Sequence, residues 1–483
     1  MNRVYYILLF LFLCSKVISE TIVLTSSQLG LDSDGVHINT EKIQNAIDKC
    51  SSNPDGGKIV FTEGKYLTGA LVLKSNVELH LEKNAVILGS INPYDYQGLK
   101  SIKKRYDSWL GLIVAYEEEN ISITGKGLID GNGRQLALNI DSLHHIGELI
   151  DKGYNVRRMR PQECARPTLF HFAKCKNVTV SNLNLRNGAS WGLTFDLCEN
   201  LTLENLYFEN RAYWNNDGFD ISDCKKVRVR NCFVNAADDA ICLKSHHVGF
   251  CNDDVVIENC EVISSASGVK FGTASTGGFK NVIVRNIRVK DTFRSAIAIE
   301  GVDGGDVSNI LVENVYATNT GNAIFLRLGH RSGKKPGIFE NITIRNLYAE
   351  IPFGRPDLEY DLRGPEVDFF HNVMPSSIVG IPGNEIKNVL LENIKIVYPG
   401  KASKGMAYVP LSRLNQVPEN IEKYPEFTMF GELPSWGFYV RHVKKIKFKN
   451  VKLQLKDYDF RPPFVFDDVE DLSKDNVEII VPE

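Results

Sequence analysis

Three aspartates in the stretch 213–245 are the residues of this chain best suited to acid–base chemistry. Asp217 lies in an Asn-Asn-Asp-Gly run, and Asp238 and Asp239 follow as an adjacent pair after a short alternating segment, 227–231. If one turn of a coiled chain separates the two motifs, all three carboxyl groups share one surface patch, because equivalent positions of successive turns stack. Carboxyl groups held close together are the acid and base of glycoside hydrolysis.

The adjacent pair carries little information by itself. Asp-Asp also occurs at 253–254 and 467–468, where we expect only acids of turns. Neighbouring residues of a straight strand face opposite ways, so Asp238 and Asp239 must lie at a bend if both serve one site. Their combination with the Asn-Asn-Asp-Gly run favours a catalytic cluster, since close carboxyls take different pKa values and divide into acid and base.

A repeated pattern, Asn-apolar-x-apolar-x-Asn, predicts how these motifs are positioned. Its closing asparagines include Asn182, Asn205, Asn231, Asn259, Asn286, Asn314, Asn346, Asn393 and Asn450. Alternation with a period of two predicts strands, and their regular return predicts a β-solenoid whose strands stack as parallel sheets about 4.8 Å apart. Each closing asparagine suits a left-handed turn, and stacked asparagine amides can hydrogen-bond from turn to turn.

A second family of short strands recurs between the first, at 219–221, 241–243, 269–271, 297–299 and 324–326. Residues at equivalent places on these strands form a stripe that is acidic on the first turns and basic on the next. The stripe collects the three aspartates and then Lys244, Lys270, Arg294, Glu300, Arg327 and His330. Such a stripe predicts a groove for an anionic chain, because Lys and Arg pair with substrate carboxylates. We expect the substrate to be bound by Lys244, His246, Lys270, Arg294 and Arg327.

The segments outside the repeat include one predicted helix, 39–50, with Asn39 or Thr40 as its N-cap. An amphipathic helix there would cover the apolar end of the solenoid. Residues 92–115 and 131–166 are expected to be irregular loops, and the second contains Arg157, Arg158 and Arg160, which either line the groove or form a solvated face. Insertions at 351–385 and 399–437 interrupt the repeat, and long loops on a rigid scaffold commonly carry function.

The N-terminal segment 1–19 reads as a secretory signal, with Arg3 before the apolar run Tyr5–Leu13 and cleavage expected after Ser19. The run is shorter than the roughly 20 residues that span a bilayer. A buried first helix is the alternative. No later segment is apolar enough to be a membrane span, so residues 20–483 are expected to form one secreted or periplasmic domain.

Composition describes an ordinary globular protein: 483 residues, 43% hydrophobic, 24% charged, with a net charge of -3. The charge argues against a nucleic-acid-binding protein, which commonly has a strong basic excess. No Cys/His spacing fits a zinc site, and the pair His246-His247 is more typical of a solvated loop than of a metal site, so no metal or cofactor is predicted. Five cysteines recur at repeat positions and are expected to be buried and unpaired: Cys175, Cys198, Cys224, Cys232 and Cys260.

The chain resembles the polygalacturonase family of pectin-degrading hydrolases, glycoside hydrolase family 28. The resemblance rests on 68–76, on 128–133, on Asn-Gly-Ala-Ser-Trp at 187–191, on Asn-Asn-Asp-Gly at 215–218, and on Asp238-Asp239 continuing to Lys244-Ser245 as in many exo-acting members. It implies a right-handed parallel β-helix and metal-free, inverting hydrolysis of a galacturonate polymer. Asp238 would be the general acid, and Asp217 and Asp239 would hold the attacking water. Inverting sites commonly separate acid and base by about 6.5–9.5 Å.

Two departures from the family pattern keep other substrates open. The family's Gly-His-Gly motif falls on Ala266-Ser267-Gly268, and its Arg-Ile-Lys motif, which grips the galacturonate carboxylate, falls near Ala296-Ile297-Ala298. Lys270, Arg294 or Arg327 would have to replace the missing cations. The alternatives are a decorated pectin such as rhamnogalacturonan or another acidic glycan, a Ca²⁺-dependent lyase, and a non-catalytic binding solenoid. Exo attack is expected if the insertions close the groove into a pocket.

Overall fold

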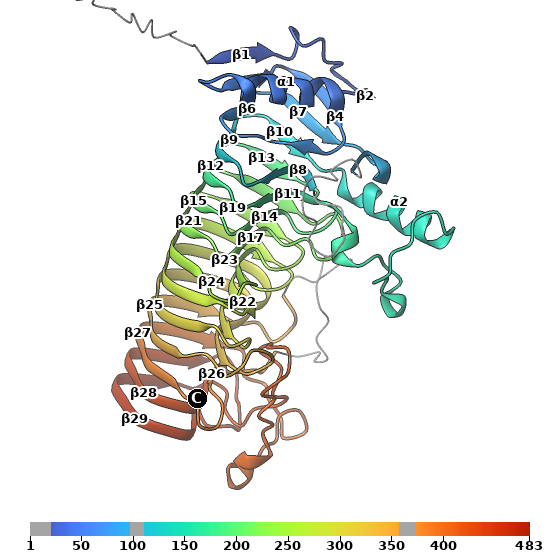
Figure 1. Cartoon of the computed structure of the whole chain (residues 1–483). Helices are drawn as coiled ribbons and strands as arrows, with labels where there is room; N and C mark the ends of the chain where they lie inside the picture. The colour runs from blue at the N-terminus through green and yellow to red at the C-terminus, as the bar shows by residue number, and fades with distance from the viewer. Residues whose placement is uncertain (1–20, 97–110, 357–371) are drawn as a thin grey trace, which may run out of the picture.

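The computed structural model describes residues 21–96, 111–356 and 372–483, and it confirms the all-β parallel solenoid. Short strands stack into one elongated coil that runs from β1 near the N-terminus to β29 near the C-terminus (Figure 1). All pairings between these strands are parallel, for example β15–β18 and β17–β20. The expected signal peptide 1–19 lies outside the described residues. In the part of the chain that the structure describes, no helix is both long and apolar enough to cross a membrane.

The strands fall into two groups along the coil. The N-terminal turns contain β1 (Ile22–Thr25), β2 (Asp34–Ile38), β3 (Gly57–Phe61), β4 (Gly64–Thr68), β5 (Leu71–Val72), β6 (Val77–Leu81), β7 (Ala85–Gly89), β8 (Gly111–Tyr116), β9 (Glu119–Gly125) and β10 (Leu128–Asp130). The remaining strands are β11 (Thr168–Ala173), β12 (Lys176–Ser181), β13 (Asn184–Arg186), β14 (Leu193–Asp196), β15 (Glu199–Glu204), β16 (Tyr207–Asn210), β17 (Phe219–Ser222), β18 (Lys225–Arg230), β19 (Phe233–Ala236), β20 (Ile241–Ser245), β21 (Asn252–Ser264), β22 (Val269–Ser275), β23 (Gly278–Gly301), β24 (Asp306–Leu328), β25 (Phe339–Glu350), β26 (Ser376–Val379), β27 (Ile386–Tyr398), β28 (Phe438–Leu455) and β29 (Phe464–Ile480).

The repeated asparagines form the corners of the coil, as predicted. Asn314 has a φ of 57°, in the left-handed region. Its amide donates to Asn286 Oδ1 at 2.9 Å, and Asn346 donates in turn to Asn314 Oδ1 at 3.0 Å. The same link recurs on most turns, so a residue type chosen for its backbone conformation also stabilises the stacking of one turn on the next.

The core fills the inside of the coil. Residues such as Leu201, Val227 and Val255 stand in register on adjacent strands and are buried. All nine cysteines of the described residues are free thiols, and the five at repeat positions are buried, which confirms the expectation of stacked, unpaired cysteine. Backbone hydrogen bonding ties these stacks together, as when Cys198 N–H donates to Cys224 Sγ at 3.3 Å.

Helix α1 (Thr40–Ser52) covers the N-terminal end of the coil. The helix residues Ile43, Ile47 and Cys50 are buried against the coil. Asn39 is the N-cap residue, but its side chain makes no capping bond. Its amide instead binds both backbone groups of Asp32, at 2.8 and 2.9 Å, and so fixes the turn that leads into the helix.

The segments between turns are more ordered than the sequence predicted. The expectation of an irregular loop at 131–166 is wrong, because helix α2 (Gly133–His145) and the 3₁₀ turns η2 (Val156–Arg158) and η3 (Glu163–Ala165) lie within it, and α2 projects from the side of the coil (Figure 1). The insertion 351–385 contains strand β26, which continues the second strand family, and 92–115 contains η1 (Pro93–Tyr96) and part of β8. The segment 399–437 contains only η4 (Leu411–Gln416).

Candidate active site

The three aspartates lie just before two neighbouring strands of the second family. Phe219 of β17 pairs with Ile241 of β20, so Asp217 and Asp239 stand at the same offset on adjacent turns. The backbone N–H of Gly218 donates to Asp239 O at 2.9 Å and locks the two turns together. Oxygen atoms of Asp217, Asp238 and Asp239 lie within 4.8 Å of one another. The predicted convergence of the carboxyls is therefore present.

The turn that carries Asp217 is held by a buried amide. Asn216 Nδ2 donates to Gly188 O at 2.8 Å and to Ser190 O at 2.6 Å, and its Oδ1 accepts the backbone N–H of Tyr213. Arg166, which the sequence analysis did not single out, is also buried and donates to Asn215 Oδ1 at 3.0 Å and to three backbone carbonyls, those of residues 162, 189 and 214. A turn fixed on both sides places its carboxyl group with little freedom.

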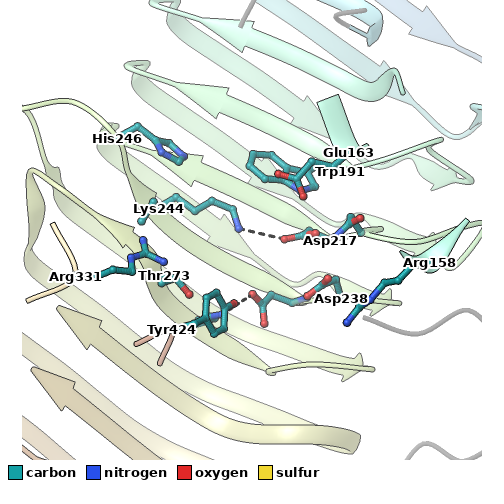
Figure 2. Close-up of a pocket in the computed structure, with 14 residues that line it drawn as sticks. Arg158, Glu163, Trp191, Asp217, Asp238, Lys244, His246, Thr273, Arg331 and Tyr424 are labelled. Atoms are coloured by element: carbon teal, nitrogen blue, oxygen red, sulfur yellow. Dashed lines mark hydrogen bonds and ion pairs between the residues drawn. The ribbon is translucent and has the colours of Figure 1, made fainter. Parts of the chain in front are cut away.

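A pocket of about 470 Å³ opens over the aspartates (Figure 2). Its lining combines acids, cations and two aromatic rings: Arg158, Glu163, Trp191, Asn215, Asp217, Asp238, Asp239, Lys244, His246, Lys270, Thr273, Ala274, Arg331 and Tyr424. Trp191 packs on the ammonium of Lys244, at 4.7 Å from the ring centre, and Tyr424 packs on that of Lys270 at 5.4 Å. The lining suits a polar, anionic ring compound with flat faces.

Asp238 has the properties of a general acid. It is 6% exposed, and its Oδ1 accepts the backbone N–H of Asp239 at 3.0 Å. Burial, together with the charge of Asp239, raises the pKa of Asp238 to about 6. A carboxyl group with such a pKa carries a proton at mildly acidic pH and can donate it to a leaving oxygen.

Asp239 has the opposite character. Its Oδ2 lies 3.1 Å from the ammonium of Lys270, and its Oδ1 accepts the backbone N–H of Ser267 at 3.1 Å. Burial opposes ionisation here as well, but Lys270 and then Lys244 outweigh it, so the pKa of Asp239 lies below its usual value. Asp239 is therefore the carboxyl of the cluster that is best suited to act as a base.

Asp217 shares one lysine with a second buried acid. The ammonium of Lys244 lies 3.2 Å from Asp217 Oδ2 and 3.0 Å from Asp220 Oδ1. Burial and the charge of Asp220 raise the pKa of Asp217 well above its usual value, although Lys244 opposes this. Within the described part of the chain, the buried Oδ1 of Asp217 has no hydrogen-bond partner, so it is placed to hold a water or a sugar hydroxyl. The sequence analysis missed Asp220, although an acid between the apolar Phe219 and Ile221 of the second strand family was a usable signal.

Comparison with known proteins decides the family. Residues 72–350 match the model of Glycosyl hydrolases family 28. The chain belongs to this family. It is 23% identical over 453 residues to the Exo-poly-alpha-D-galacturonosidase of Dickeya chrysanthemi, covering 77% of this chain and 71% of that protein. It is 25% identical over 404 residues to the Probable polygalacturonase of Vitis vinifera, covering 77% and 73% of the two chains.

The fold of the chain is also shared with a solved member of family 28. The Family 28 exopolygalacturonase of Yersinia enterocolitica superposes with a TM-score of 0.68 at 18% identity, over 94% of this chain and 78% of the other. The coil is thus the right-handed parallel β-helix that the resemblance implied. As a member of family 28, the protein is a glycoside hydrolase.

This family 28 hydrolase brings most of the predicted cations to the site. Lys244, His246 and Lys270 line the pocket. Arg294 is not among the lining residues, and it is paired with Glu426 at 2.7 Å. Arg327 lies elsewhere, because its fully buried guanidinium donates to Gly380 O, Glu419 O and Asn420 O, and so anchors the 399–437 insertion. We therefore do not retain Arg327 among the proposed substrate ligands.

The insertions supply pocket residues that the repeat did not predict. Arg158 and Glu163 come from 131–166, and Tyr424 comes from 399–437. Arg158 had been weighed as either a groove residue or a solvated one, and it lines the pocket, whereas Tyr424 carried no signal in the sequence beyond the aromatic content of its segment. Tyr424 OH accepts a hydrogen bond from Lys270 Nζ at 3.2 Å, so the insertion is attached to the cation next to the catalytic cluster.

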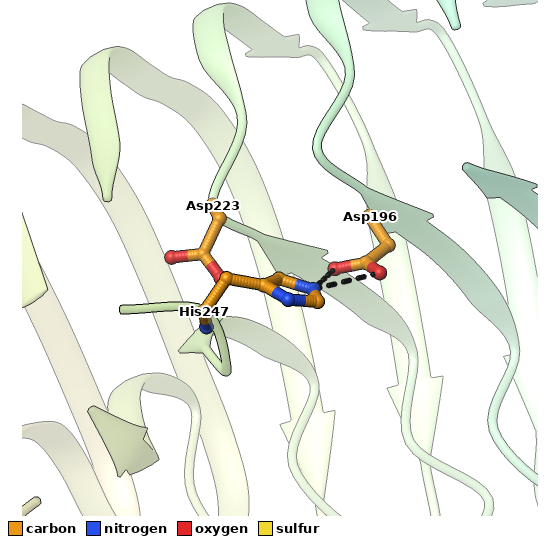
Figure 3. A group of neighbouring side chains, drawn as sticks. All are labelled: Asp196, Asp223 and His247. Atoms are coloured by element: carbon orange, nitrogen blue, oxygen red, sulfur yellow. Dashed lines mark hydrogen bonds and ion pairs between the residues drawn. The ribbon is translucent and has the colours of Figure 1, made fainter. Parts of the chain in front are cut away.

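Among the described residues, two groups of side chains have the composition of a metal site. In the catalytic cluster, the ammonium groups of Lys244 and Lys270 already occupy the positions from which a cation would neutralise the acids. The second group is Asp196, Asp223 and His247 (Figure 3). Asp223 accepts the backbone N–H groups of residues 246 and 247 at 2.8 and 2.9 Å, and His247 Nε2 lies 3.0 Å from both oxygens of Asp196. This group shapes the turn that presents His246 to the pocket.

Proposed function

We propose that the protein is an exo-acting hydrolase of pectic, α-linked galacturonic-acid-containing polysaccharide or oligosaccharide. One observation carries the proposal: three carboxyls converge within 4.8 Å in a pocket whose other charged groups include four cations. The names of the Dickeya and Vitis relatives support the same substrate class.

The proposed reaction assigns one proton transfer to each of two aspartates. Asp238 donates its proton to the glycosidic oxygen as the bond to the anomeric carbon breaks. A water held between Asp217 and Asp239 attacks that carbon from the other face and gives its proton to Asp239. The pKa of Asp238, raised to about 6, and the lowered pKa of Asp239 match these roles.

The stereochemical course of the reaction is proposed from the placement of the carboxyl oxygens. The carboxyl oxygens approach within 4.8 Å, closer than the separation of about 6.5–9.5 Å that inverting enzymes commonly show. We propose inversion nonetheless, because a lysine ammonium pairs with Oδ2 of Asp217 and with Oδ2 of Asp239, while Oδ1 of Asp217, which has no partner among the described residues, can hold the attacking water. Proton NMR of the first product anomer tests this, and a retained anomer would make one of the two the nucleophile.

Exo attack is proposed because insertions supply part of the wall of the pocket. Arg158 and Glu163 belong to one insertion and Tyr424 to another, and Figure 2 shows Arg158 at the opposite side of the row of acids from Arg331. A pocket with such walls accepts a chain end rather than the middle of a chain. Early digests of a long substrate should contain a single small product, and a ladder of oligomers would contradict exo attack.

Substrate and acid are tested together. A panel of homogalacturonan, rhamnogalacturonan and other acidic glycans should give a new reducing end without the ultraviolet absorbance of an unsaturated product, which would indicate a lyase. Asp238→Asn should lower kcat by roughly 10²–10⁴-fold on the best substrate. Asp254→Asn is the matched control, since Asp254 is an exposed acid that pairs with Arg228 on the outer surface. Undiminished turnover by the Asp238 variant would refute the assignment.

A hydrolase of decorated pectin is the second candidate. It is favoured by the residues at the family's cation positions, because Ala296 and Ala298 are buried and apolar and offer no partner to a carboxylate. A higher kcat/KM on rhamnogalacturonan than on homogalacturonan would select it.

We also propose that the protein is exported and cleaved after Ser19, on the basis of the apolar run 5–13. The N-terminal sequence of the protein recovered from outside the cytoplasm tests this directly.

A further inference from the structure

A pectic substrate presents a carboxylate, and the pocket must bind it without the cations that the family motif would place at Ala296 and Ala298. Among the cations of the lining, one had no place in the sequence analysis: Arg331. It follows β24 in the turn that connects this strand to β25, and it reaches the pocket from the side of Thr273 and His246 (Figure 2).

The guanidinium of Arg331 is held in one orientation. Nε donates to Asp303 Oδ1 at 2.9 Å and Nη2 donates to Asp303 Oδ2 at 2.6 Å. Its backbone N–H donates to Val302 O at 2.6 Å. Such a two-point pairing restricts rotation of a side chain that otherwise has many rotamers.

The carboxylate of Asp303 is itself held in place by neighbouring hydrogen-bond donors. It is 3% exposed, its Oδ2 accepts the backbone N–H of Ser275 at 3.2 Å, and its Oδ1 accepts the hydroxyl of Ser332 at 2.8 Å. Its own backbone N–H donates to Ser275 Oγ at 3.0 Å. The carboxylate therefore acts as a rigid support for the arginine rather than as a solvated partner.

The pairing uses only one edge of the guanidinium. Arginine has five N–H donors, and Asp303 takes one from Nε and one from Nη2. Both protons of Nη1 and the second proton of Nη2 remain, and within the described residues Nη1 has no hydrogen-bond partner. These donors form the end-on edge, which matches the two oxygens of a carboxylate.

We propose that Arg331 binds the carboxylate of the uronate unit in the pocket and thereby sets the preference for acidic over neutral sugars. The inference rests on the proposed function, because it names the group that recognises that substrate. In Figure 2, Arg331 and His246 lie on one side of Lys244, and Asp217 and Asp238 lie on the other. The carboxylate is thus held at the cationic side while the scissile bond lies over the acids.

The test compares two forms of one oligosaccharide, the free acid and its methyl ester, which differ by the carboxylate charge and one methyl group. Arg331→Gln should lower kcat/KM for the acid by roughly 10- to 100-fold, mostly through KM, as expected for the loss of charge-assisted hydrogen bonds. The ester should be hydrolysed about as well as by the wild type. Arg331→Lys, which keeps the charge but loses the planar fork, should recover only part of the acid preference.

Arg345→Gln is the matched control. Arg345 makes a similar two-point pairing, with Glu313 at 2.8 and 2.6 Å, on strand β25 outside the pocket. The Arg345→Gln variant should hydrolyse the acid and the ester as well as the wild type does. If Arg331→Gln lowers acid and ester hydrolysis equally, or only lowers the melting temperature, Arg331 is a structural residue and the inference is overturned. If the wild type hydrolyses neither form of any uronate substrate, the proposed function itself fails.

Discussion

Replacing Lys270 by Met tests whether a buried lysine makes Asp239 the base of the cluster. The ammonium of Lys270 lies 3.1 Å from Asp239 and 3.8 Å from Glu300, and the residue is 1% exposed. Methionine has nearly the same length and no charge. The variant therefore removes the cation, and leaves both acids in a dry environment.

The expected loss of stability follows from that geometry. Removing one partner of a buried ion pair costs about 3–5 kcal/mol, because the remaining charge is left without compensation. The lowered pKa of Asp239 contributes stability above its unfolded value of 3.8, and this contribution is lost as the pH falls through the folded pKa. The destabilisation of Lys270→Met should accordingly be larger at pH 7 than at pH 4, where protonation relieves the unpaired acids.

The pH dependence of kcat/KM should also differ between Lys270→Met and the wild type. In the wild type, kcat/KM should rise with the ionisation of Asp239, below pH 4, and fall as Asp238 loses its proton near pH 6. Without Lys270, burial raises the pKa of Asp239. The acidic limb of the pH profile of kcat/KM should move to higher pH, so the bell-shaped profile becomes narrower. Each pH unit of this shift corresponds to about 1.4 kcal/mol.

The assay is a pH series of kcat/KM, combined with thermal unfolding at pH 4 and pH 7. Lys290→Met is the control, since Lys290 is half exposed and pairs with Glu261 at 2.8 Å on the outer surface. Exposed pairs contribute little, about 0–1 kcal/mol. A Lys270 variant with the lower limb of the wild type would refute the assignment of Asp239 as a base tuned by this lysine.

Two further variants examine the scaffold. Burial raises the pKa of Glu300 to about 7, so the stability that its protonated form contributes is lost as the pH rises from about 4.5 to 7. Glu300→Gln should therefore raise the unfolding free energy at pH 8 by about 3 kcal/mol relative to the wild type, with no gain at pH 4. An equal effect at both pH values would contradict the raised pKa of Glu300. Asn314 has a φ of 57°, and its side-chain amide makes two hydrogen bonds to the asparagines of the adjacent turns. Asn314→Ala should therefore lower the free energy of unfolding by about 1–3 kcal/mol in denaturant unfolding. Asn314→Gly should lower it less, because glycine tolerates the left-handed conformation.

The coil and the convergence of the acids could be predicted because both depend on local, repeated signals. Each closing asparagine specifies a corner, and each alternating segment specifies a strand. Asp217 and Asp239 stand at the same offset before Phe219 and Ile241, and the register of these strands then brings them together. No long-range information was needed beyond the period of the repeat.

The walls of the pocket could not be predicted, because the insertions have no repeat to set their register. Tyr424 meets Lys270 across 154 residues of sequence, and no periodicity links them. Arg327 is the opposite case, because the repeat predicted its position but not the segment that covers it. The stripe placed it correctly beside Glu300 in the register of β23 and β24, but the insertion 399–437 covers it, and its donors are used by carbonyls of that segment.

Five buried acids share two buried lysines at the centre of the site: Asp217, Asp220, Asp238, Asp239 and Glu300 contact or face Lys244 and Lys270. Arg294 adds a third cation, because its charge lowers the pKa of Asp238 and of Asp239, although Glu426 pairs with it at 2.7 Å. With fewer cations than acids, the cluster cannot ionise fully in a dry environment and must retain protons. The lysines decide where those protons lie: Lys270 keeps Asp239 ionised, and Asp238, which has no lysine within pairing distance among the described residues, keeps its proton. Identical side chains thus become acid and base through the placement of two ammonium groups.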